Sequence, residues 1–417
     1  MSVSTNEYDV IVVGGGPAGA ALAIRLAAAG ARVLVAEQKR FPRAKLCGEF
    51  ISPECRAHFA ALGVLDAITA AGGARVVTTD FYTHGGRKVS VPSAWFGPRG
   101  DGAQTDAGGA ALGLSRAEMD ARLLARARAL GVTVWEETTA CGLVYEAGRV
   151  CGVELLRGRE RVAVRAAVTA DATGRTRALA RRVERARVLD DDDAGGRAEL
   201  NGHTRQRARL VAFKAHLANV ELAEGACEIY FYRGGYGGLS RVEGGLSNLC
   251  FIAAARDVRA LGGDAERVMR EVVMTNRRAA KVLAGGRVRS EWLAVALESF
   301  GRWPLVPCAG LLTVGDAAAF IDPFTGSGML MALESGALAA QVIAPALPAL
   351  RAGHDFAALA ADYRARYRAR FDARLRVCSV LRRAAFAPAI VTTTAALALN
   401  TSASLRRALA RATRQSA

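Results

Sequence analysis

Three glycines near the N-terminus have the spacing of a phosphate-binding turn. Gly14, Gly16 and Gly19 follow the apolar run Val10–Val13 in the order G-x-G-x-x-G. The first glycine of such a turn permits a tight bend, the second lets the backbone approach a pyrophosphate, and the third lets a helix pack closely. Glu37 ends the next apolar segment, where a carboxylate can accept hydrogen bonds from a ribose diol. The pattern predicts a dinucleotide site rather than the glycine turn of another α/β protein.

Two later segments place acidic residues and glycines directly after apolar runs. Asp171 follows one such run, and Asp316 follows another. Beyond Asp316, Gly326 and Gly328 precede an apolar segment that predicts a helix over Met329–Ile343. The N-terminus of that helix would carry a partial positive charge and stabilise an anion in front of it. These segments are expected to complete the same dinucleotide site.

Cys47 lies in a loop with Gly48, between the predicted second strand and a helix near Pro53 that Ser52 would cap. One interpretation is a small packing residue. The other is a thiol that lines the substrate side of the site. The sequence leaves both open.

The apolar periodicity predicts the elements that hold these residues. Strands of a parallel sheet are expected at Val10–Val13, Arg32–Ala36 and Leu311–Val314. Strands of an antiparallel sheet are expected within Arg75–Val91 and at Arg209–Ala218, Cys227–Arg233 and Leu246–Ala255. Other expectations are a strand at Trp292–Leu297 returning to the first domain, a flexible turn at Gly234–Gly238, a solvated loop at Arg181–Asn201 and a helix at Asp264–Leu283.

The predicted fold class is α/β (α+β), a Rossmann-type domain interrupted by an antiparallel substrate-binding sheet and followed by a helical region. The expected dinucleotide domain comprises residues 1–74, 111–182 and 300–344. The expected substrate domain comprises 75–110 and 183–299, and the helical region 345–417.

Composition restricts the class of protein. Half of the 417 residues are apolar, which excludes a disordered chain. The eight cysteines form no CxxC pair and the five histidines are scattered, so we expect neither a metal site nor a disulfide framework, but a reducing cytoplasm. The N-terminus has no signal-peptide pattern. The net charge of +17 comes largely from arginine, and we expect no nucleic-acid partner.

Four blocks together resemble the FAD-dependent group of p-hydroxybenzoate hydroxylase-like flavoproteins. They are GGGPAG with Glu37, the helix with Arg116, ADATGRTR and GDAAAFIDPFTGSG. Within that group the chain is similar to the geranylgeranyl reductase family, through KLCGE, GYGGLSR and Asp322-Pro323. The resemblance implies FAD, with Arg116 supporting it, Asp171 near the pyrophosphate and Asp316 at the ribityl chain. Because no covalent attachment motif is evident, we expect this FAD to be non-covalent. The expected cofactor contacts are Gly14, Gly16, Pro17, Ala18, Gly19, Glu37, Gln38, Lys45, Cys47, Gly48, Arg116, Asp171, Gly174, Gly315, Asp316, Pro323, Gly326, Gly328 and Met329.

The resemblance implies an oxidoreductase that saturates C=C bonds of an apolar prenyl or polyketide-like chain by hydride transfer from reduced flavin. Cys47 and Tyr236 are the expected catalytic residues, and NADPH or another reductant is the expected transient electron donor. The alternative is a monooxygenase that hydroxylates or epoxidises through a peroxyflavin. A halogenase with a Trp-x-Trp-x-x-Pro block is disfavoured, because no two of the four tryptophans are two residues apart.

The C-terminal region combines basic and apolar character. Tyr363, Tyr367 and Phe371 recur every four residues among arginines, which predicts an amphipathic helix over Asp362–Arg383. The uncharged stretch Ala384–Leu405 is rich in Thr and Ser and makes a poor membrane span. Two interpretations stay open: a helical cap over the substrate tunnel, and peripheral contact with the inner, anionic face of a membrane.

Overall fold

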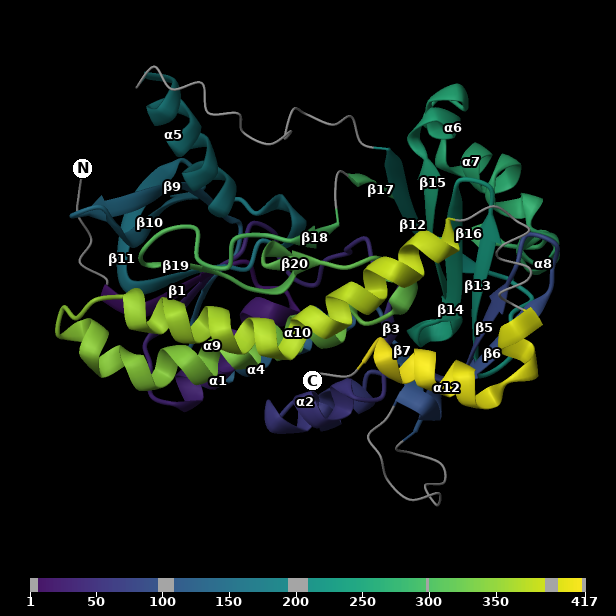
Figure 1. Ribbon diagram of the computed structural model, residues 1–417, viewed down its shortest axis with the longest axis horizontal. Helices are drawn as coiled ribbons and strands as arrows, with labels where there is room; N and C mark the ends of the chain where they lie inside the picture. Colours follow the sequence, from purple (N-terminus) through teal and green to yellow (C-terminus); the bar gives the residue numbers. More distant parts are fainter. Residues whose placement is uncertain (1–6, 97–108, 194–208, 298–299, 387–396, 415–417) are drawn as a thin grey trace.

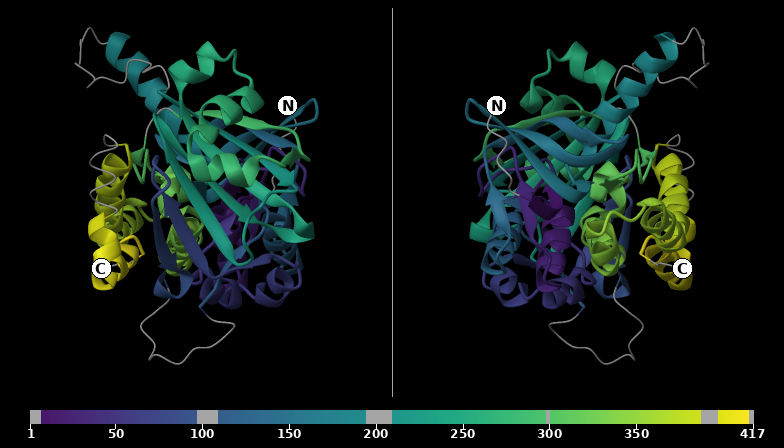
Figure 2. Two further views of the ribbon diagram at one scale, coloured as in Figure 1. Left: turned by 90° about the vertical axis from the view of Figure 1, so that its right-hand side faces the viewer. Right: turned by 90° about the vertical axis from the view of Figure 1, so that its left-hand side faces the viewer.

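The computed structural model describes residues 7–96, 109–193, 209–297, 300–386 and 397–414. Two sheets dominate it, each with its own helical cover, and the C-terminal helices form a separate layer along one side (Figures 1 and 2). The predicted fold class is confirmed.

The first sheet has the strand order β8-β2-β1-β11-β10-β9, with β19 paired to β11. Strands β8, β2, β1, β11 and β19 run parallel, and the β9–β10 hairpin extends the sheet antiparallel. Their bounds are β1 Glu7–Val13, β2 Val33–Ala36, β8 Thr133–Trp135, β9 Thr138–Glu146, β10 Arg149–Arg157, β11 Glu160–Asp171 and β19 Leu311–Thr313. Continuous apolar runs are typical of parallel strands that are covered on both faces, and Val10–Val13 is buried throughout.

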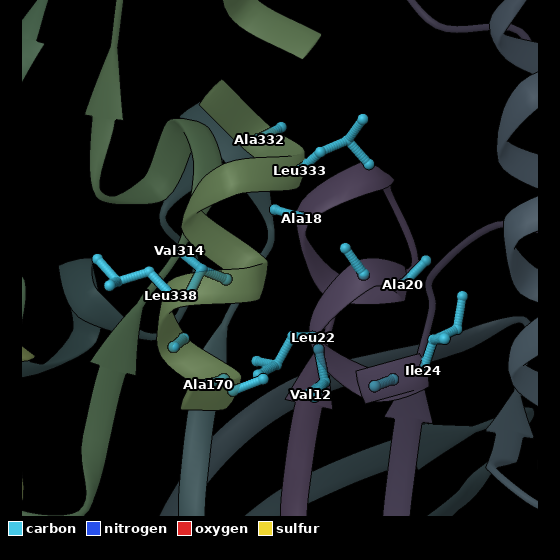
Figure 3. Close-up of a cluster of buried hydrophobic side chains, with 14 of the residues drawn as sticks. Val12, Ala18, Ala20, Leu22, Ile24, Ala170, Val314, Ala332, Leu333 and Leu338 are labelled. Carbon is cyan, nitrogen blue, oxygen red and sulfur yellow. The ribbon is translucent and has the colours of Figure 1, made fainter. Parts of the chain in front are cut away.

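Three helices cover one face of this sheet: α1 Pro17–Ala28, α4 Arg116–Ala129 and α9 Gly328–Arg351. Figure 3 shows α1 and α9 side by side above Val12, Ala170 and Val314. The contact is close because Gly336 of α9 faces the backbone of Ala18. The helix expected over Met329–Ile343 is therefore present and longer than predicted.

Helix α9 is long and apolar enough to cross a membrane by length and composition, and it is the one helix of the described residues that passes this test. Most of it is buried inside the protein against α1 and the C-terminal helix α10. The apolar side chains of α9 therefore form part of the hydrophobic core of the protein.

The second sheet has the order β16-β12-β15-β14-β13-β5-β6, with β17 paired to β12. All pairs are antiparallel except β13 with β5. The bounds are β5 Thr78–Tyr82, β6 Lys88–Pro92, β12 Leu210–Ala218, β13 Ala226–Tyr232, β14 Gly235–Arg241, β15 Ser247–Ala254, β16 Arg287–Val288 and β17 Leu293–Leu297. Helices α6 Ala255–Ala260, α7 Ala265–Glu271 and α8 Arg277–Leu283 cover its outer face (Figure 1).

Smaller elements connect the two sheets. They are β3 Phe50–Ile51, α2 Cys55–Ala61, α3 Leu65–Thr69, β4 Ala74–Val76, the 3-10 turn η1 Ser93–Phe96, β7 Ala111–Gly113, β18 Gly301–Arg302 and β20 Ala319–Phe320. Strands β3, β7 and β4 form a three-stranded sheet, and β18 pairs with β20.

Three predicted elements were wrong in type or place. Gly234–Gly238 is not a flexible turn, because from Gly235 onward it belongs to the buried strand β14. Trp292–Leu297 does not return to the first domain, because β17 pairs with β12. The first part of Arg181–Asn201 is helical, as α5 Ala180–Asp193, and the rest lies outside the described residues.

Two helix predictions needed smaller corrections. The helix expected over Asp264–Leu283 is broken into α7 and α8 by a 3-10 turn at Val273–Thr275. Helix α2 begins two residues later than expected, with Glu54 rather than Ser52 at the N-cap position. Ser115, in contrast, caps α4 by accepting from the backbone N–H of Glu118, as predicted.

The C-terminal layer consists of α10 Ala357–Ala385 and α12 Ala403–Ala412. The predicted amphipathic helix is confirmed in α10, where Tyr363, Tyr367 and Phe371 are fully buried against the first domain. Helix α12 packs on η1 and β6 of the second sheet (Figure 1). The middle of Ala384–Leu405, from 387 to 396, lies outside the described residues.

Candidate flavin and substrate site

A cavity of about 460 Å³ lies between the two sheets. Its wall includes most of the residues expected to contact the cofactor: Gly14, Gly16, Pro17, Ala18, Glu37, Gln38, Lys45, Cys47, Gly48, Arg116, Gly174, Gly315, Asp316, Pro323, Gly326, Gly328 and Met329. Residues from four distant parts of the sequence therefore meet at one cavity.

The glycine turn has the geometry that its spacing predicts. Gly14 has a φ of +107°, and a Cβ there would lie 2.4 Å from the carbonyl oxygen of Ala172. A Cβ on Gly19 would lie 2.0 Å from the carbonyl oxygen of Gly14, so Gly19 packs α1 against the turn and is not part of the cavity wall. At Gly16 the nearest neighbour of such a Cβ would be an Arg116 nitrogen 3.7 Å away, which leaves room for a ligand.

Glu37 lies at the end of β2, where its carboxylate faces the turn. Oε2 accepts from the backbone N–H of Gly15 at 2.8 Å, and Oε1 accepts from that of Lys39 at 3.0 Å. The side chain is almost fully buried and lines the cavity. This position is suitable for accepting hydrogen bonds from a ribose diol.

Cationic side chains surround the adjoining part of the cavity. Arg116 donates to both carboxylate oxygens of Asp120, at 2.8 and 2.6 Å, and Arg43 donates to Asp120 at 3.2 Å. Lys45 and Arg175 also line the cavity, but neither forms an ion pair with a carboxylate of the described residues. Burial, reinforced for Lys45 by the charges of Arg43 and Arg116, lowers the pKa of both side chains. Two cations at the cavity wall that form no ion pair with a carboxylate of the described residues are suited to an anionic pyrophosphate, so these residues fit FAD.

Asp171 differs from its expected place. The residue is fully buried beneath the cavity and does not line it. Its carboxylate accepts from Thr173, in both backbone and side chain, and from the backbone N–H groups of Leu179 and Ala180. Asp171 therefore fixes the turn that carries Gly174, and Gly174 does line the cavity.

Asp316 does line the cavity, in the 3-10 turn that follows β19. Burial raises the pKa of its carboxyl group, and the nearby Arg175, Arg116 and Lys45 partly offset this effect. A desolvated carboxylate at this place can accept hydrogen bonds from the hydroxyl groups of a ribityl chain.

The opposite end of the cavity is apolar and aromatic. Tyr236 of β14 has its ring 5.8 Å from that of Phe324 and 6.3 Å from that of Phe231. The apolar wall here includes Phe81, Ala212, Ile229, Tyr236, Ile252, Leu297, Phe320 and Phe324. These side chains come mainly from the second sheet, which thereby supplies the apolar end of the cavity.

Tyr236 is held in place by its hydroxyl group. That hydroxyl donates to Asp322 and accepts from the backbone N–H of Phe324 at 2.9 Å. Burial, with the neighbouring carboxylate of Asp322, raises the pKa of Tyr236 well above its usual value. The phenol is therefore neutral and protonated at physiological pH.

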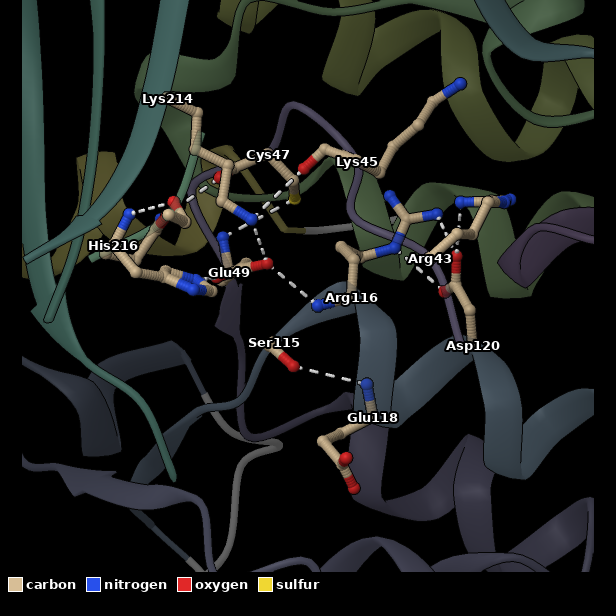
Figure 4. A network of polar contacts seen from close by, with 12 residues as sticks. Arg43, Lys45, Cys47, Glu49, Ser115, Arg116, Glu118, Asp120, Lys214 and His216 are labelled. Carbon is tan, nitrogen blue, oxygen red and sulfur yellow. Dashed lines mark hydrogen bonds and ion pairs between the residues drawn. The ribbon is translucent and has the colours of Figure 1, made fainter. Parts of the chain in front are cut away.

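A buried polar network below Cys47 was not expected from the sequence (Figure 4). Glu49, with no exposed surface, pairs with Lys214 and, at 2.6 Å, with His216 Nε2, both on β12. Glu49 also accepts from the backbone N–H of Arg116 at 2.9 Å, and Asn248 donates to the Cys47 carbonyl oxygen at 3.0 Å. The network joins the Cys47 loop and the start of α4 to strands β12 and β15 of the second sheet.

One signal could have revealed this network. Lys214 and His216 are two residues apart and so lie on one face of a strand that is otherwise apolar. A buried lysine in such a strand requires a carboxylate partner. Glu49 of the KLCGE block could have been predicted as that partner.

The comparisons with known proteins agree with this geometry. Residues 7–186 match the family described as FAD binding domain. A digeranylgeranylglycerophospholipid reductase of Methanocella arvoryzae is 25% identical over 89% of this chain and 83% of its own length. A menaquinone reductase of Mycolicibacterium smegmatis is 29% identical over 80% of this chain and 76% of its own length.

Solved structures share the fold. A flavin-dependent brominase superposes with a TM-score of 0.75 at 19% identity, over 98% of this chain and 93% of its own. A geranylgeranyl bacteriochlorophyll reductase-like protein of Thermoplasma acidophilum has a TM-score of 0.68 at 21% identity, over 99% and 93%. At these identities the likeness concerns the fold alone.

The fold, the cavity and the matched domain define an FAD-dependent oxidoreductase. Within that class the resemblance to the geranylgeranyl reductase family is confirmed, because several digeranylgeranylglycerophospholipid reductases are related to this chain over most of its length.

Proposed function

We propose that this oxidoreductase reduces C=C bonds of an apolar, prenyl-like or polyketide-like substrate. The observation that carries the proposal is the apolar and aromatic wall around Tyr236, which adjoins the flavin motifs within one cavity. Such a wall has little to offer a charged substrate, whereas it would bury a hydrocarbon chain favourably. The names of the two relatives, both reductases and one acting on a geranylgeranyl lipid, support the same choice.

Bound FAD, once reduced, would supply a hydride to one carbon of the double bond. The protein must then provide a proton for the other carbon. Cys47 and Tyr236 both line the cavity and both carry a transferable proton. The raised pKa of Tyr236 keeps its phenol protonated, but its hydrogen is donated to Asp322, so Tyr236 can deliver a proton only when that hydrogen bond is exchanged for one to the substrate. The Cys47 thiol donates no hydrogen bond to the described residues. Its sulfur accepts one from the backbone N–H of Glu49 at 3.4 Å.

We further propose NADPH as the transient electron donor. The first sheet with its glycine turn accounts for one dinucleotide, the FAD, so the donor would dock and leave. Mixing the purified holoenzyme with NADPH without oxygen should bleach the flavin absorbance. If NADPH leaves the flavin oxidised while dithionite reduces it, another reductant serves.

The decisive experiment separates reduction from oxygenation. The flavin is reduced with dithionite under anaerobic conditions, and a geranylgeranyl lipid is added to one half of the sample without oxygen. The other half receives the lipid together with O₂. Flavin reoxidation by the lipid alone, with two hydrogens gained at each reduced bond, is the expected result. A product that forms only with O₂ and gains an oxygen atom would contradict the proposal and establish the monooxygenase.

The C-terminal layer supports a proposal about how an apolar substrate is collected, at an anionic membrane surface. The exposed large apolar side chains of this layer are Val380, Phe386, Leu397 and Leu405, and arginines 382, 383, 406 and 407 lie beside them. The ring of Phe386 is 6.1 Å from that of Tyr236, so this surface continues into the cavity wall. Apolar side chains among arginines are typical of helices that lie on anionic membranes.

Sedimentation with vesicles tests this proposal. We expect the protein to bind vesicles containing anionic lipid at physiological salt, and Val380→Asp to weaken the binding. Val77→Asp is the matched control, because Val77 is also an exposed large apolar residue but lies next to β5 of the second sheet, outside the C-terminal layer. Equal loss in both variants, or no binding by the parent protein, would exclude the membrane surface. A cytoplasmic location, peripheral to the inner face of the membrane, is proposed on the same grounds.

A further inference from the structure

The last described residue, Arg414, lies inside the protein next to the flavin motif. Its guanidinium donates through Nη1 to the carbonyl oxygen of Gly326 at 3.1 Å and through Nη2 to that of Thr325 at 3.0 Å. Only 7% of the residue is exposed, and it lines the same cavity as Thr325, Gly326 and Gly328. A residue from the far end of the chain thus completes the wall of the site.

The turn that Arg414 contacts determines where α9 begins. Gly326 has a φ of +62°, in the left-handed region, and α9 starts two residues later at Gly328. Ser327 makes no side-chain capping bond to the helix. The planar guanidinium binds two successive carbonyl groups at once, which fixes a turn more firmly than a single donor would.

Arg414 is itself held by the rest of the C-terminal layer. Arg374 of α10, almost fully buried, donates to the backbone carbonyl oxygen of Arg414 at 2.5 Å and to Glu334 of α9 at 2.6 Å. The Arg414 guanidinium also lies 4.4 Å from the ring centroid of Phe96. Helices α9 and α10 and the C-terminal segment therefore hold one another in place around the turn.

The charge of Arg414 is only weakly neutralised. The carboxylate paired with it is Glu54, whose Oε1 lies 3.9 Å from Nε, beyond hydrogen-bond distance. Neither oxygen of Glu54 has a hydrogen-bond partner among the described residues. The guanidinium therefore adds positive charge close to the N-terminus of α9, where the helix dipole has the same sign.

We propose that Arg414 is a positioning residue of the flavin site, which fixes the Thr325–Gly328 turn and adds positive charge to the wall of the cavity where that turn lies. The C-terminal segment is then part of the cofactor site and not only a cover over it. Negative charge that develops on the flavin during reduction would be stabilised. Arg414 would act on cofactor binding in the same way in a reductase and in a monooxygenase.

The test compares Arg414→Gln with Arg411→Gln, which removes the same charge from the last turn of α12 but contacts neither Thr325 nor Gly326. FAD affinity is measured by titrating the apoprotein, and the midpoint reduction potential by equilibration with a reference dye. We expect Arg414→Gln to weaken FAD binding by about tenfold, because the turn at the cavity loses two hydrogen bonds from a charged donor, and to make the potential more negative. Arg411→Gln should change neither quantity.

Two further variants keep the proposal falsifiable if Arg414→Gln folds poorly. Arg414→Lys keeps the charge but loses the two-carbonyl geometry, so affinity should fall while the potential stays near that of the parent. Glu54→Gln removes the nearby carboxylate, so the potential should become more positive. A folded Arg414→Gln with unchanged affinity and potential, or a Glu54→Gln whose potential does not rise, would overturn the proposal.

Discussion

Cys47 is the residue whose role depends most on chemistry rather than on packing. It lines the cavity on a loop held by Asn248, and Cys250 of the same strand as Asn248 also lines the cavity. If its thiol delivers the proton, Cys47→Ala should lower turnover by about 100-fold, the lower range for general acid catalysis, and leave FAD affinity unchanged. Single-turnover reoxidation of the reduced enzyme by substrate measures this.

Cys250→Ala is the matched control for Cys47. It removes a thiol of the same cavity whose pKa burial raises to about 12, and we expect it to retain most of the activity. Equal losses in the two variants would show that Cys47 only shapes the cavity. The proton would then come from Tyr236.

Glu49 is the residue on which the contact between the two sheets depends. Glu49→Gln would leave the ammonium of Lys214 buried without its counter-charge, and we expect a loss of about 3 kcal/mol in the free energy of unfolding. Glu118→Gln breaks the partly exposed pair with Arg122, which should cost about 1 kcal/mol or less. Urea unfolding of the apoproteins measures both. A Glu49→Gln variant no less stable than Glu118→Gln would contradict this role.

The same carboxylate should make stability depend on pH. Burial by itself would raise the pKa of Glu49, but the His216 hydrogen bond and the charge of Lys214 outweigh it, and the pKa lies below 4.5. A folded-state pKa below the unfolded value stabilises the protein above the unfolded pKa, and this contribution is lost as the pH falls through the folded pKa. When the pH is lowered from about 7 to about 3, the free energy of unfolding should therefore fall less for Glu49→Gln than for the parent protein.

At the scale of elements, the sequence predicted the strands and helices that carry strong patterns. The parallel strands, the capping Ser115 and the amphipathic α10 were found where periodicity and capping placed them. Glycine misled the prediction at β14, because glycines usually break strands. In β14 they are needed for packing, since a Cβ on Gly235 would lie 1.9 Å from the carbonyl oxygen of Ile252.

The acidic run Asp190–Asp193 misled the prediction in a different way. Four aspartates suggested a solvated loop, but the preceding residues of α5 are alanine, arginine, valine, glutamate and leucine, most of them good helix formers.

Contacts between residues far apart in the sequence could not be predicted from local sequence patterns either. The pair of Glu49 with Lys214 joins residues 165 positions apart, and the contact of Arg414 with Gly326 joins residues 88 apart.

The contact between α1 and α9 provides a prediction at this scale. A Cβ on Gly336 would lie 2.3 Å from the carbonyl oxygen of Ala18, and a backbone atom cannot move aside as a flexible side chain could. Gly336→Ala gains about 1 kcal/mol in helix propensity, but overpacking costs about 1–3 kcal/mol. Because the clash is with backbone, we expect a net loss of stability and weaker FAD binding, since Ala18 lines the cavity.

Gly85→Ala is the control for that substitution, since nothing lies within 4 Å of a Cβ there. Thermal unfolding and FAD titration should leave Gly85→Ala close to the parent protein. A Gly336→Ala variant as stable as the parent would mean that the two helices can separate at no cost. The close approach would then have no role in forming the site.

At the scale of the whole molecule, the cavity is where all three layers meet. The first sheet contributes Gly14 and Glu37, the second contributes Ile252, and the C-terminal layer contributes Arg414. The sequence could predict the first contribution from a motif, because one local stretch supplies it. The other two depend on how distant segments pack, and they became visible only in the folded protein.

Bound FAD should therefore stabilise all three layers and not only the glycine turn. At a concentration about 100 times its dissociation constant, FAD should add about 2.7 kcal/mol to the free energy of unfolding. Hydrogen exchange with and without FAD would show where that stabilisation acts. We expect slower exchange at the glycine turn, at residues 45–49 and at the start of α9, with no change in α8 on the outer face of the second sheet. Protection confined to residues 14–37 would mean that the substrate sheet and the C-terminal layer merely adjoin the cofactor, and that the network around Glu49 and the contact of Arg414 act independently of it.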